Sequence, residues 1–174
     1  MIRYSAFLGA ALLVCTVPAT AQDAPAITDA QIAHIAYTAG RLDIEAAKQA
    51  LAKSEDAEVR TFAESMVRDH EAVNVKALAL VKKLGVTPQA NPTSEALTET
   101  AAAKRESLAA LDGDAFDEAY LENEAAYHAT VNGALAQTLI PGARNAELKA
   151  LLETGLTLFR EHQAHAEQLA AGRD

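Results

Sequence analysis

Four long segments of this 174-residue chain carry apolar residues at steps of three and four, the spacing that places side chains on one face of an α-helix. Between residues 28 and 84, glycine and proline are scarce and alanine is abundant, and the alternation of β-branched and polar residues that is typical of strands is absent. One of these stripes consists of Val59, Ala63, Met66, His70, Val73, Ala77, Leu80 and Leu84. The sequence therefore predicts an all-α fold.

Capping signals indicate where the helices begin and end. Thr28 and Gln31 have the spacing of a capping box, and Ser54 followed by two acidic residues is typical of an N-cap. Gly85 has the character of a C-terminal cap, and Asn145 is a candidate N-cap for the last helix. The expected helices, in chain order, are 29–53, 55–84, 94–111, 115–139 and 146–170.

Short connections predict how the long helices lie relative to one another. A turn at Ser54 and another at Pro141-Gly142 imply that the long helices they join are antiparallel neighbours. Small residues on the stripe of 29–53 would allow its backbone to approach a neighbour closely. We therefore expect an antiparallel four-helix bundle, with residues 94–111 as an additional short helix before the third long helix.

The first 21 residues have the pattern of a secretory signal peptide. Arg3 precedes an apolar run, and Ala19-Thr20-Ala21 matches a small-x-small cleavage site. Residues 22–174 would then form the mature protein as a single domain, without Cys15, the only cysteine, and hence without a disulfide or a thiolate ligand. We expect an exported protein, periplasmic or loosely associated with the cell envelope, with no membrane span after signal cleavage.

Charge and motif content exclude several classes of function. The chain has 24 acidic and 15 basic residues, a formal net charge of −9, and no basic cluster, which makes it a poor candidate for binding nucleic acid or anionic lipid. It has neither a Gly-rich phosphate loop nor a nucleophile elbow. We therefore predict no catalytic residues and no organic cofactor, and the sequence leaves the oligomeric state open.

Three histidines interrupt apolar stripes at mid-length, each on a different expected helix: His70, His128 and His162. A buried imidazole must be hydrogen-bonded, ligated to a metal or held neutral at a cost. Glu124 precedes His128 by one turn and should lie level with His162. Asp43 interrupts the stripe of 29–53 but falls about 7 Å short of the level of His70, a gap that helix tilt or side-chain reach would close.

The candidate metal ligands are therefore His70, His128, His162, Glu124 and Asp43. Di-iron sites of helical bundles use a Glu-x-x-His motif on two helices, and no histidine of this chain has a glutamate three residues before it. We expect instead a mononuclear site for one divalent ion of iron, zinc, copper or nickel. Tyr120 and Tyr127 flank the polar positions, where they would either bond core groups such as Asp43 or His70 or take part in redox chemistry.

Several motifs resemble a known family. They are Ala57-Glu58-Val59-Arg60-Thr61-Phe62-Ala63 running into Met66-Val67-Arg68-Asp69-His70, Gly113-x-x-Phe116-Asp117-x-x-Tyr120, His128 and His162. In order and spacing, residues 27–169 resemble the exported bacterial family called domain of unknown function 4142, whose members are often labelled outer membrane proteins. The resemblance implies a ferritin-like helical bundle in the cell envelope and supplies no established activity.

The chain departs from that family pattern at two places. The family commonly has a glutamate where this chain has the shorter acid Asp43. Leu-Pro often precedes the last histidine of the family, whereas this chain has Leu156-Thr157-Leu158-Phe159, so no proline kink is expected there.

Two hypotheses of function follow from these observations. In the first, an exported ferritin-like bundle binds a metal ion through its core histidine and carboxylate residues, for metal handling or stress protection. In the second, the histidines are structural and the protein is a non-catalytic scaffold or interaction protein with an envelope protein as partner. A redox enzyme is a third alternative. Uptake of stoichiometric metal by the mature protein distinguishes the first two.

Overall fold

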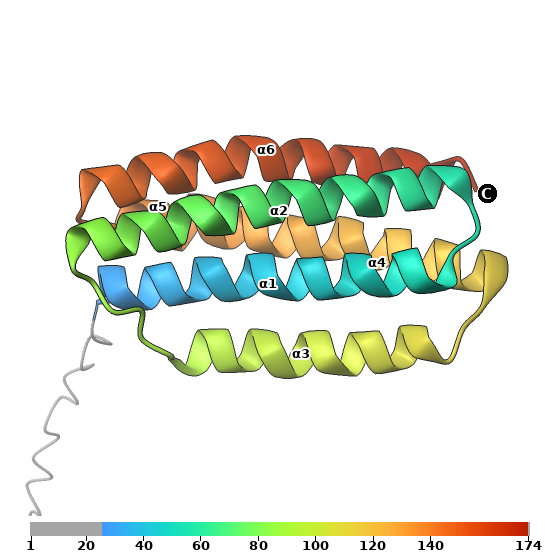
Figure 1. Ribbon diagram of the computed structural model, residues 1–174, viewed down its shortest axis with the longest axis horizontal. Coiled ribbons are helices and arrows are strands. Elements are labelled where there is room, and N and C mark those ends of the chain that lie inside the picture. The colour runs from blue at the N-terminus through green and yellow to red at the C-terminus, as the bar shows by residue number, and fades with distance from the viewer. Residues whose placement is uncertain (1–25, 174) are drawn as a thin grey trace, which may run out of the picture.

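The computed structural model describes residues 26–173 (Figure 1). The predicted signal peptide, residues 1–21, lies outside the described residues. Within the described range there is no β-strand, which confirms the all-α prediction, and no helix there is both long and apolar enough to cross a membrane. The helices are α1 (Asp29–Lys53), α2 (Ala57–Leu84), α3 (Pro92–Ala109), α4 (Gly113–Ala134), the π-helical segment η1 (Leu135–Leu139), α5 (Ile140–Gly142) and α6 (Ala146–Ala171).

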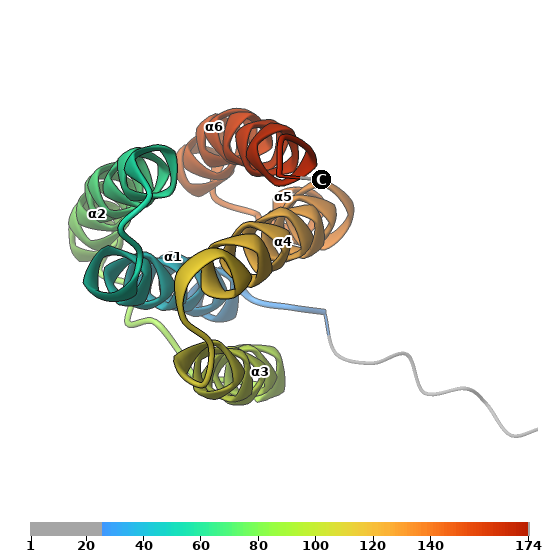
Figure 2. The same cartoon turned by 90° about the vertical axis from the view of Figure 1, so that its right-hand side faces the viewer.

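Four long helices, α1, α2, α4 and α6, surround a shared core, and α3 lies outside it against α1 and α4 (Figure 2). The colour gradient in Figure 1 shows that neighbours around the bundle run in opposite directions. Because α3 carries the chain back along the bundle, α2 and α4 are parallel and lie diagonally opposite each other. The predicted antiparallel four-helix bundle with one additional helix is confirmed.

The end of α1 agrees with the prediction, but the start of α2 does not. Helix α1 spans the predicted residues and carries the Thr28 capping box. Ser54, however, ends α1 rather than capping α2, because its buried hydroxyl accepts a hydrogen bond from the Asp56 backbone at 3.2 Å. The side chain of Asp56 is the N-cap of α2 and accepts from two backbone N–H groups of the first turn. Helix α2 therefore begins two residues later than expected.

The predicted turn at Pro141-Gly142 is wrong. Pro141 has no N–H to donate to the preceding turn, and the chain accommodates it by widening to the π-helix η1 and continuing as α5. The turn comes at Ala143, and Asn145 then caps α6 as predicted. The short helix also begins two residues earlier than expected, because Asn91 caps it and Pro92 occupies its first turn.

The bundle core consists of two apolar clusters separated by a buried polar layer. One cluster, near the α1–α2 turn, includes Phe62, Met66, Phe116 and Leu121. The other, near the start of α6, includes Ile32, Leu135, Leu139, Leu148, Leu152 and Phe159. In each long helix, buried polar residues separate the part that belongs to one cluster from the part that belongs to the other. These residues are Asp43, His70, Glu124, His128 and His162. We call these five residues the polar layer.

Two helical glycines provide a test of how the helices pack. A Cβ added at Gly133 would meet no heavy atom within 4 Å among the described residues, so Gly133→Ala should raise the free energy of unfolding by up to about 1 kcal/mol through helix propensity alone. At Gly40 the same Cβ would lie 2.7 Å from Oδ1 of buried Asn74 on α2, so Gly40→Ala should lower the melting temperature. Thermal unfolding measures both. Equal gains at the two positions would contradict the close approach of α1 to Asn74.

Candidate metal centre

The five residues of the polar layer are those predicted as metal ligands, and the structure buries all of them: none is more than 5% exposed. Asp43 comes from α1, His70 from α2, Glu124 and His128 from α4, and His162 from α6. Each one interrupts the buried stripe of its helix, so the same periodicity that folds the bundle directs these side chains into its interior. Every long helix thus contributes at least one polar group.

The three histidines converge on one point. One ring nitrogen of each of His70, His128 and His162 lies within 4.8 Å of the corresponding nitrogens of the other two. Asp43 adds a carboxylate oxygen, Oδ2, at 3.5 Å from Nε2 of both His70 and His128. The ring of Phe159 stacks on His70 with 4.6 Å between centroids and shields the cluster on the side of the second apolar cluster.

Hydrogen bonds on the outer side of two rings fix which nitrogen is free. Nδ1 of His128 lies 3.0 Å from the Glu124 carbonyl oxygen, so Nδ1–H donates there and Nε2 keeps its lone pair. Nε2 of His162 lies 3.1 Å from Oδ2 of Asp69, which leaves Nδ1 as the free nitrogen. Among the residues that the structure describes, neither nitrogen of His70 has a hydrogen-bond partner. Each imidazole therefore presents an unprotonated nitrogen that is available as a ligand.

Asp69 is a site residue that the sequence analysis missed. It bonds His162 across the seam between α2 and α6, and it also accepts from Arg68 through both carboxylate oxygens, at 2.8 and 3.0 Å. Burial would raise its pKa, but the hydrogen bonds from Arg68 and His162 lower the pKa below the usual value of an aspartic acid. An ionised Asp69 can therefore accept a hydrogen bond from Nε2–H of His162 and orient its ring. In the sequence Asp69 stood out only as a member of the family motif that ends at His70, and that motif does not indicate a contact with α6.

Asp43 lies closer to the histidines than the sequence indicated. Because α1 ends at Lys53 and α2 begins only at Ala57, the offset between Asp43 and His70 shrinks to three residues, or about 4.5 Å of helix rise. Side-chain reach covers that distance. Asp43 is thus in contact range of two imidazoles, and the expected gap of about 7 Å along the helix axis was too large.

Glu124 holds a different position from the expected one. It groups with Asp43 and His128, with ligand atoms within 4.8 Å of one another, and not with His70 and His162. Its Oε2 lies 3.8 Å from Nδ1 of His128, the nitrogen that already bonds the Glu124 carbonyl. The expected alignment of Glu124 with His162 therefore does not bring the two into one ligand set. His128 is shared by both groups.

Burial governs the protonation of the imidazoles. It lowers the pKa of His70 well below its ordinary value, with the neighbouring imidazoles His128 and His162 adding to the effect. It lowers the pKa of His128 to about 4 against the raising effect of the Glu124 carbonyl, and it lowers the pKa of His162 against that of Asp69. At neutral pH all three rings are uncharged, which is the form that binds metal ions.

The carboxyl groups are shifted in the opposite direction. Burial raises the pKa of Asp43 to about 8, an effect that its interaction with Glu124 offsets only in part. Burial also raises the pKa of Glu124 well above its ordinary value, and the charge of Asp43 adds to this. Without a cation in the layer both acids are therefore neutral near pH 7. A divalent cation would favour the ionised form of each.

The two tyrosines near the polar layer differ in their contacts. The Tyr127 hydroxyl donates to the Ala39 carbonyl at 2.8 Å, which ties α4 to α1 and is a structural contact, although with a partner other than the expected Asp43 or His70. The Tyr120 hydroxyl is fully buried and has no hydrogen-bond partner within residues 26–173. Burial and the nearby acids Glu124 and Asp43 raise its pKa well above 10, so it stays protonated.

These features define an all-α bundle with a buried cluster of histidines and carboxylic acids. The chain belongs to the family described as domain of unknown function DUF4142, whose model matches residues 15–169. The resemblance seen in the sequence is thereby confirmed. No curated protein matches the chain.

Two solved structures share the fold. One is a predicted secreted protein of the DUF305 family from Streptomyces coelicolor, similar to this chain with a TM-score of 0.71 and 14% identity over 83% of this chain and 93% of that one. The other is CopM in its Cu(II)-bound form, with a TM-score of 0.64 and 14% identity over 84% of this chain and 98% of that one. At this identity the likeness concerns the fold alone.

The raised pKa of Asp43 predicts how stability depends on pH in metal-free protein. Between pH 6.5 and about 8 the unfolded chain already has its carboxyl groups ionised, whereas folded Asp43 still holds its proton until its pKa of about 8. The folded state therefore binds more protons, and the free energy of unfolding should fall as pH rises through this window. Urea unfolding in the presence of a chelator measures the slope. Asp43→Asn should reduce it, and a flat profile in the unchanged protein would contradict burial of a neutral acid.

Proposed function

We propose that this protein binds one divalent metal ion in its polar layer, through His70, His128 and His162 with Asp43 as the carboxylate ligand. Glu124 serves as the second carboxylate, beside the ion. Two observations carry the proposal: one ring nitrogen of each of the three histidines converges on the same point, and each ring has at least one nitrogen without a hydrogen-bond partner in the described residues. Their spacing within 4.8 Å lets one ion between them contact all three after small side-chain adjustments.

The free-energy cost of burying polar atoms without partners supports a role as metal ligands, rather than a structural role, for these side chains. A buried polar atom without a partner costs about 1–3 kcal/mol, and both carboxylate oxygens of Asp43 and both nitrogens of His70 are in that position within residues 26–173. A structural core histidine would be expected to have its hydrogen bonds satisfied. An ion bound to these atoms would compensate several of them at once. This argument favours metal binding over the scaffold alternative.

The donor atoms favour a borderline transition metal. Three imidazoles and a carboxylate suit iron, zinc, copper or nickel, and the only cysteine, Cys15, is far from the layer in the sequence. Among divalent ions Cu(II) binds such donors most tightly. The Cu(II)-bound form of CopM shares this fold and supports copper as the first ion to test.

The setting we propose is the periplasm or the cell envelope, with metal handling or protection against metal stress as the role. The signal-peptide pattern of residues 1–21 and the fold shared with a predicted secreted protein support this setting. The five residues of the polar layer are almost fully buried, which favours retention of an ion, and retention is what storage or buffering requires.

Metal binding is tested directly on the mature protein after removal of metal with a chelator. Calorimetric titration with Cu(II), Zn(II), Ni(II) and Fe(II) should give one ion per chain for at least one metal. His70→Ala and His162→Ala should each abolish binding that is stoichiometric at micromolar protein, since each removes one of the converging nitrogens. Circular dichroism checks that both variants remain helical.

His34→Ala is the matched control, because His34 lies on α1 outside both ligand groups and bonds only Thr38 among the described residues. It should leave metal binding unchanged. Absence of binding by all four metals to the unchanged protein would overturn the proposal and leave the envelope scaffold with structural histidines as the better hypothesis.

Substitution of Asp69 should weaken metal binding without abolishing it. Asp69→Asn removes the negative charge that holds His162 in the tautomer with Nδ1 free. Loss of such an outer partner typically lowers metal affinity by about 10–100-fold, so the dissociation constant should rise by that factor while the stoichiometry stays at one. Competition with a chromophoric chelator measures it. Asp112→Asn, at an exposed acid that pairs with Lys53, serves as the control and should change nothing.

A further inference from the structure

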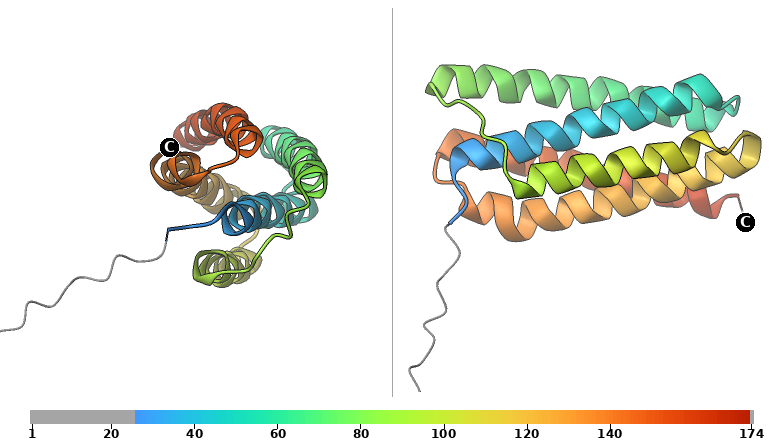
Figure 3. Two further views of the ribbon diagram at one scale, coloured as in Figure 1. Left: turned by 90° about the vertical axis from the view of Figure 1, so that its left-hand side faces the viewer. Right: turned by 90° about the horizontal axis from the view of Figure 1, so that it is seen from below.

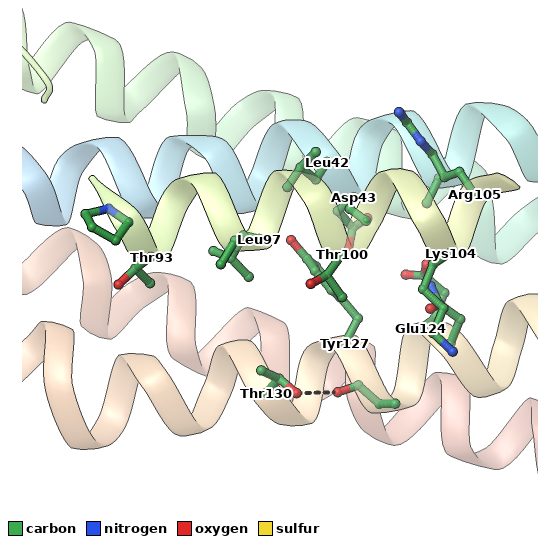
Figure 4. Close-up of a pocket in the computed structure, with 16 residues that line it drawn as sticks. Leu42, Asp43, Thr93, Leu97, Thr100, Lys104, Arg105, Glu124, Tyr127 and Thr130 are labelled. Atoms are coloured by element: carbon green, nitrogen blue, oxygen red, sulfur yellow. Dashed lines mark hydrogen bonds between the residues drawn. The ribbon is translucent and has the colours of Figure 1, made fainter. Parts of the chain in front are cut away.

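Helix α3 lies beside the bundle (Figure 3). A cavity lies beneath it (Figure 4). The cavity has a volume of about 620 Å³ and lies between α3 and the faces of α1 and α4. Within residues 92–109 only Ser94 and Leu108 are buried. The side of α3 that faces the bundle consists mainly of small residues, such as Thr93, Ala96 and Ala101, which leave this space unfilled.

Contacts at the two ends of α3 keep the space open. At the start, the Asn91 side chain donates to the Gln31 carbonyl of α1 at 3.4 Å. Near the end, Gln49 of α1 donates to the Arg105 carbonyl at 2.9 Å, and Lys53 donates to the last carbonyl of α3 at 3.0 Å. These contacts join both ends of α3 to α1, and the unfilled space lies between them. We call the space the α3 groove.

The walls of the α3 groove are mainly apolar, and they continue into the bundle. Leu42 and Ala46 of α1 and Ala126 of α4 form much of the floor. A second cavity of about 320 Å³ shares the lining residues Thr93, Leu97 and Thr130 with the groove and is also lined by Phe159 of α6. One end of the groove is therefore apolar and leads inward.

The other end of the groove carries a positive charge. Lys104 lines it there, on the same side as Glu124 and far from Thr93 (Figure 4). Asp43 and Glu124 also line the cavity, but no carboxylate within residues 26–173 lies in ion-pairing distance of Lys104. Arg105, next to Lys104, forms an ion pair with Glu45. On a chain of net charge −9, an unpaired cation at the mouth of an apolar groove selects for a negatively charged group.

We infer that the α3 groove binds a single-chain anionic amphiphile, with its alkyl chain between α3 and the α1–α4 face and its head group at Lys104. The groove follows α3 from Thr93 to Lys104, about 16 Å of helix, so an extended chain fits it better than a compact ring system. Its volume lies in the range of small-molecule sites. Binding there needs no metal ion in the polar layer. Because Asp43 and Glu124 line both the groove and the candidate metal site, the titrations below use metal-free protein, so their outcome does not depend on whether metal binds.

The occupant is tested with dodecanoate, titrated calorimetrically into the mature protein below the concentration at which it forms micelles. We expect saturable binding of one molecule per chain. Ala101→Trp places an indole in the groove and should abolish this binding, whereas Ala102→Trp, on the exposed side of α3, should not. Circular dichroism shows whether each variant is folded. Equal binding by both tryptophan variants would overturn the location.

The charge of the head group is tested with dodecanol and dodecyltrimethylammonium. Both should bind more weakly than dodecanoate, and Lys104→Glu should weaken dodecanoate binding by about tenfold. Lys76→Glu makes the same charge change at an exposed position of α2 and should have no such effect. Dodecyl phosphate, a second anionic probe, shows by its relative affinity whether a carboxylate or a phosphate head is preferred. If dodecanoate does not bind, or if dodecanol binds equally well, the inference is wrong.

Discussion

The polar layer is the constraint on which the rest of the structure depends. Five ionisable side chains are buried between two apolar clusters, where an isolated charge is strongly disfavoured. Burial therefore keeps the histidines unprotonated and the acids protonated, and most of their polar atoms lack partners in the described residues. The apolar clusters on either side supply the stability that lets the bundle tolerate this layer.

The sequence predicted most of the fold because helix signals are local. Periodic stripes, the Thr28 capping box and the Gly85 cap each depend on a few adjacent residues, and the structure has them as expected. The errors came where two local signals compete. Ser54 and Asp56 are both good N-caps, and only the burial of Ser54 under the end of α1 decides between them. Pro141 is typical of a helix end, but here the chain widens to the π-helix η1 just before it and stays helical through Pro141.

The site was predicted in part for the same reason. A histidine that interrupts an apolar stripe can be recognised from its own helix, so the members of the polar layer were found. Their mutual distances depend on the length of each turn, which explains why a two-residue shift at Ala57 changed the position of Asp43 relative to His70. Asp69 acts across the seam between α2 and α6, and no pattern within α2 alone identifies a contact with His162.

The order of the helices has a consequence for folding. Asp43 and His70 belong to the hairpin of α1 and α2, whereas His128 and His162 belong to the pairing of α4 with α6. Neither half of the chain holds a complete set of donors. An ion in the polar layer would thus act as a cross-link between segments far apart in sequence, closing a long loop whose ordering entropy the apolar contacts alone would otherwise have to offset. With such an ion, occupancy of the site and docking of the two halves would be a single equilibrium.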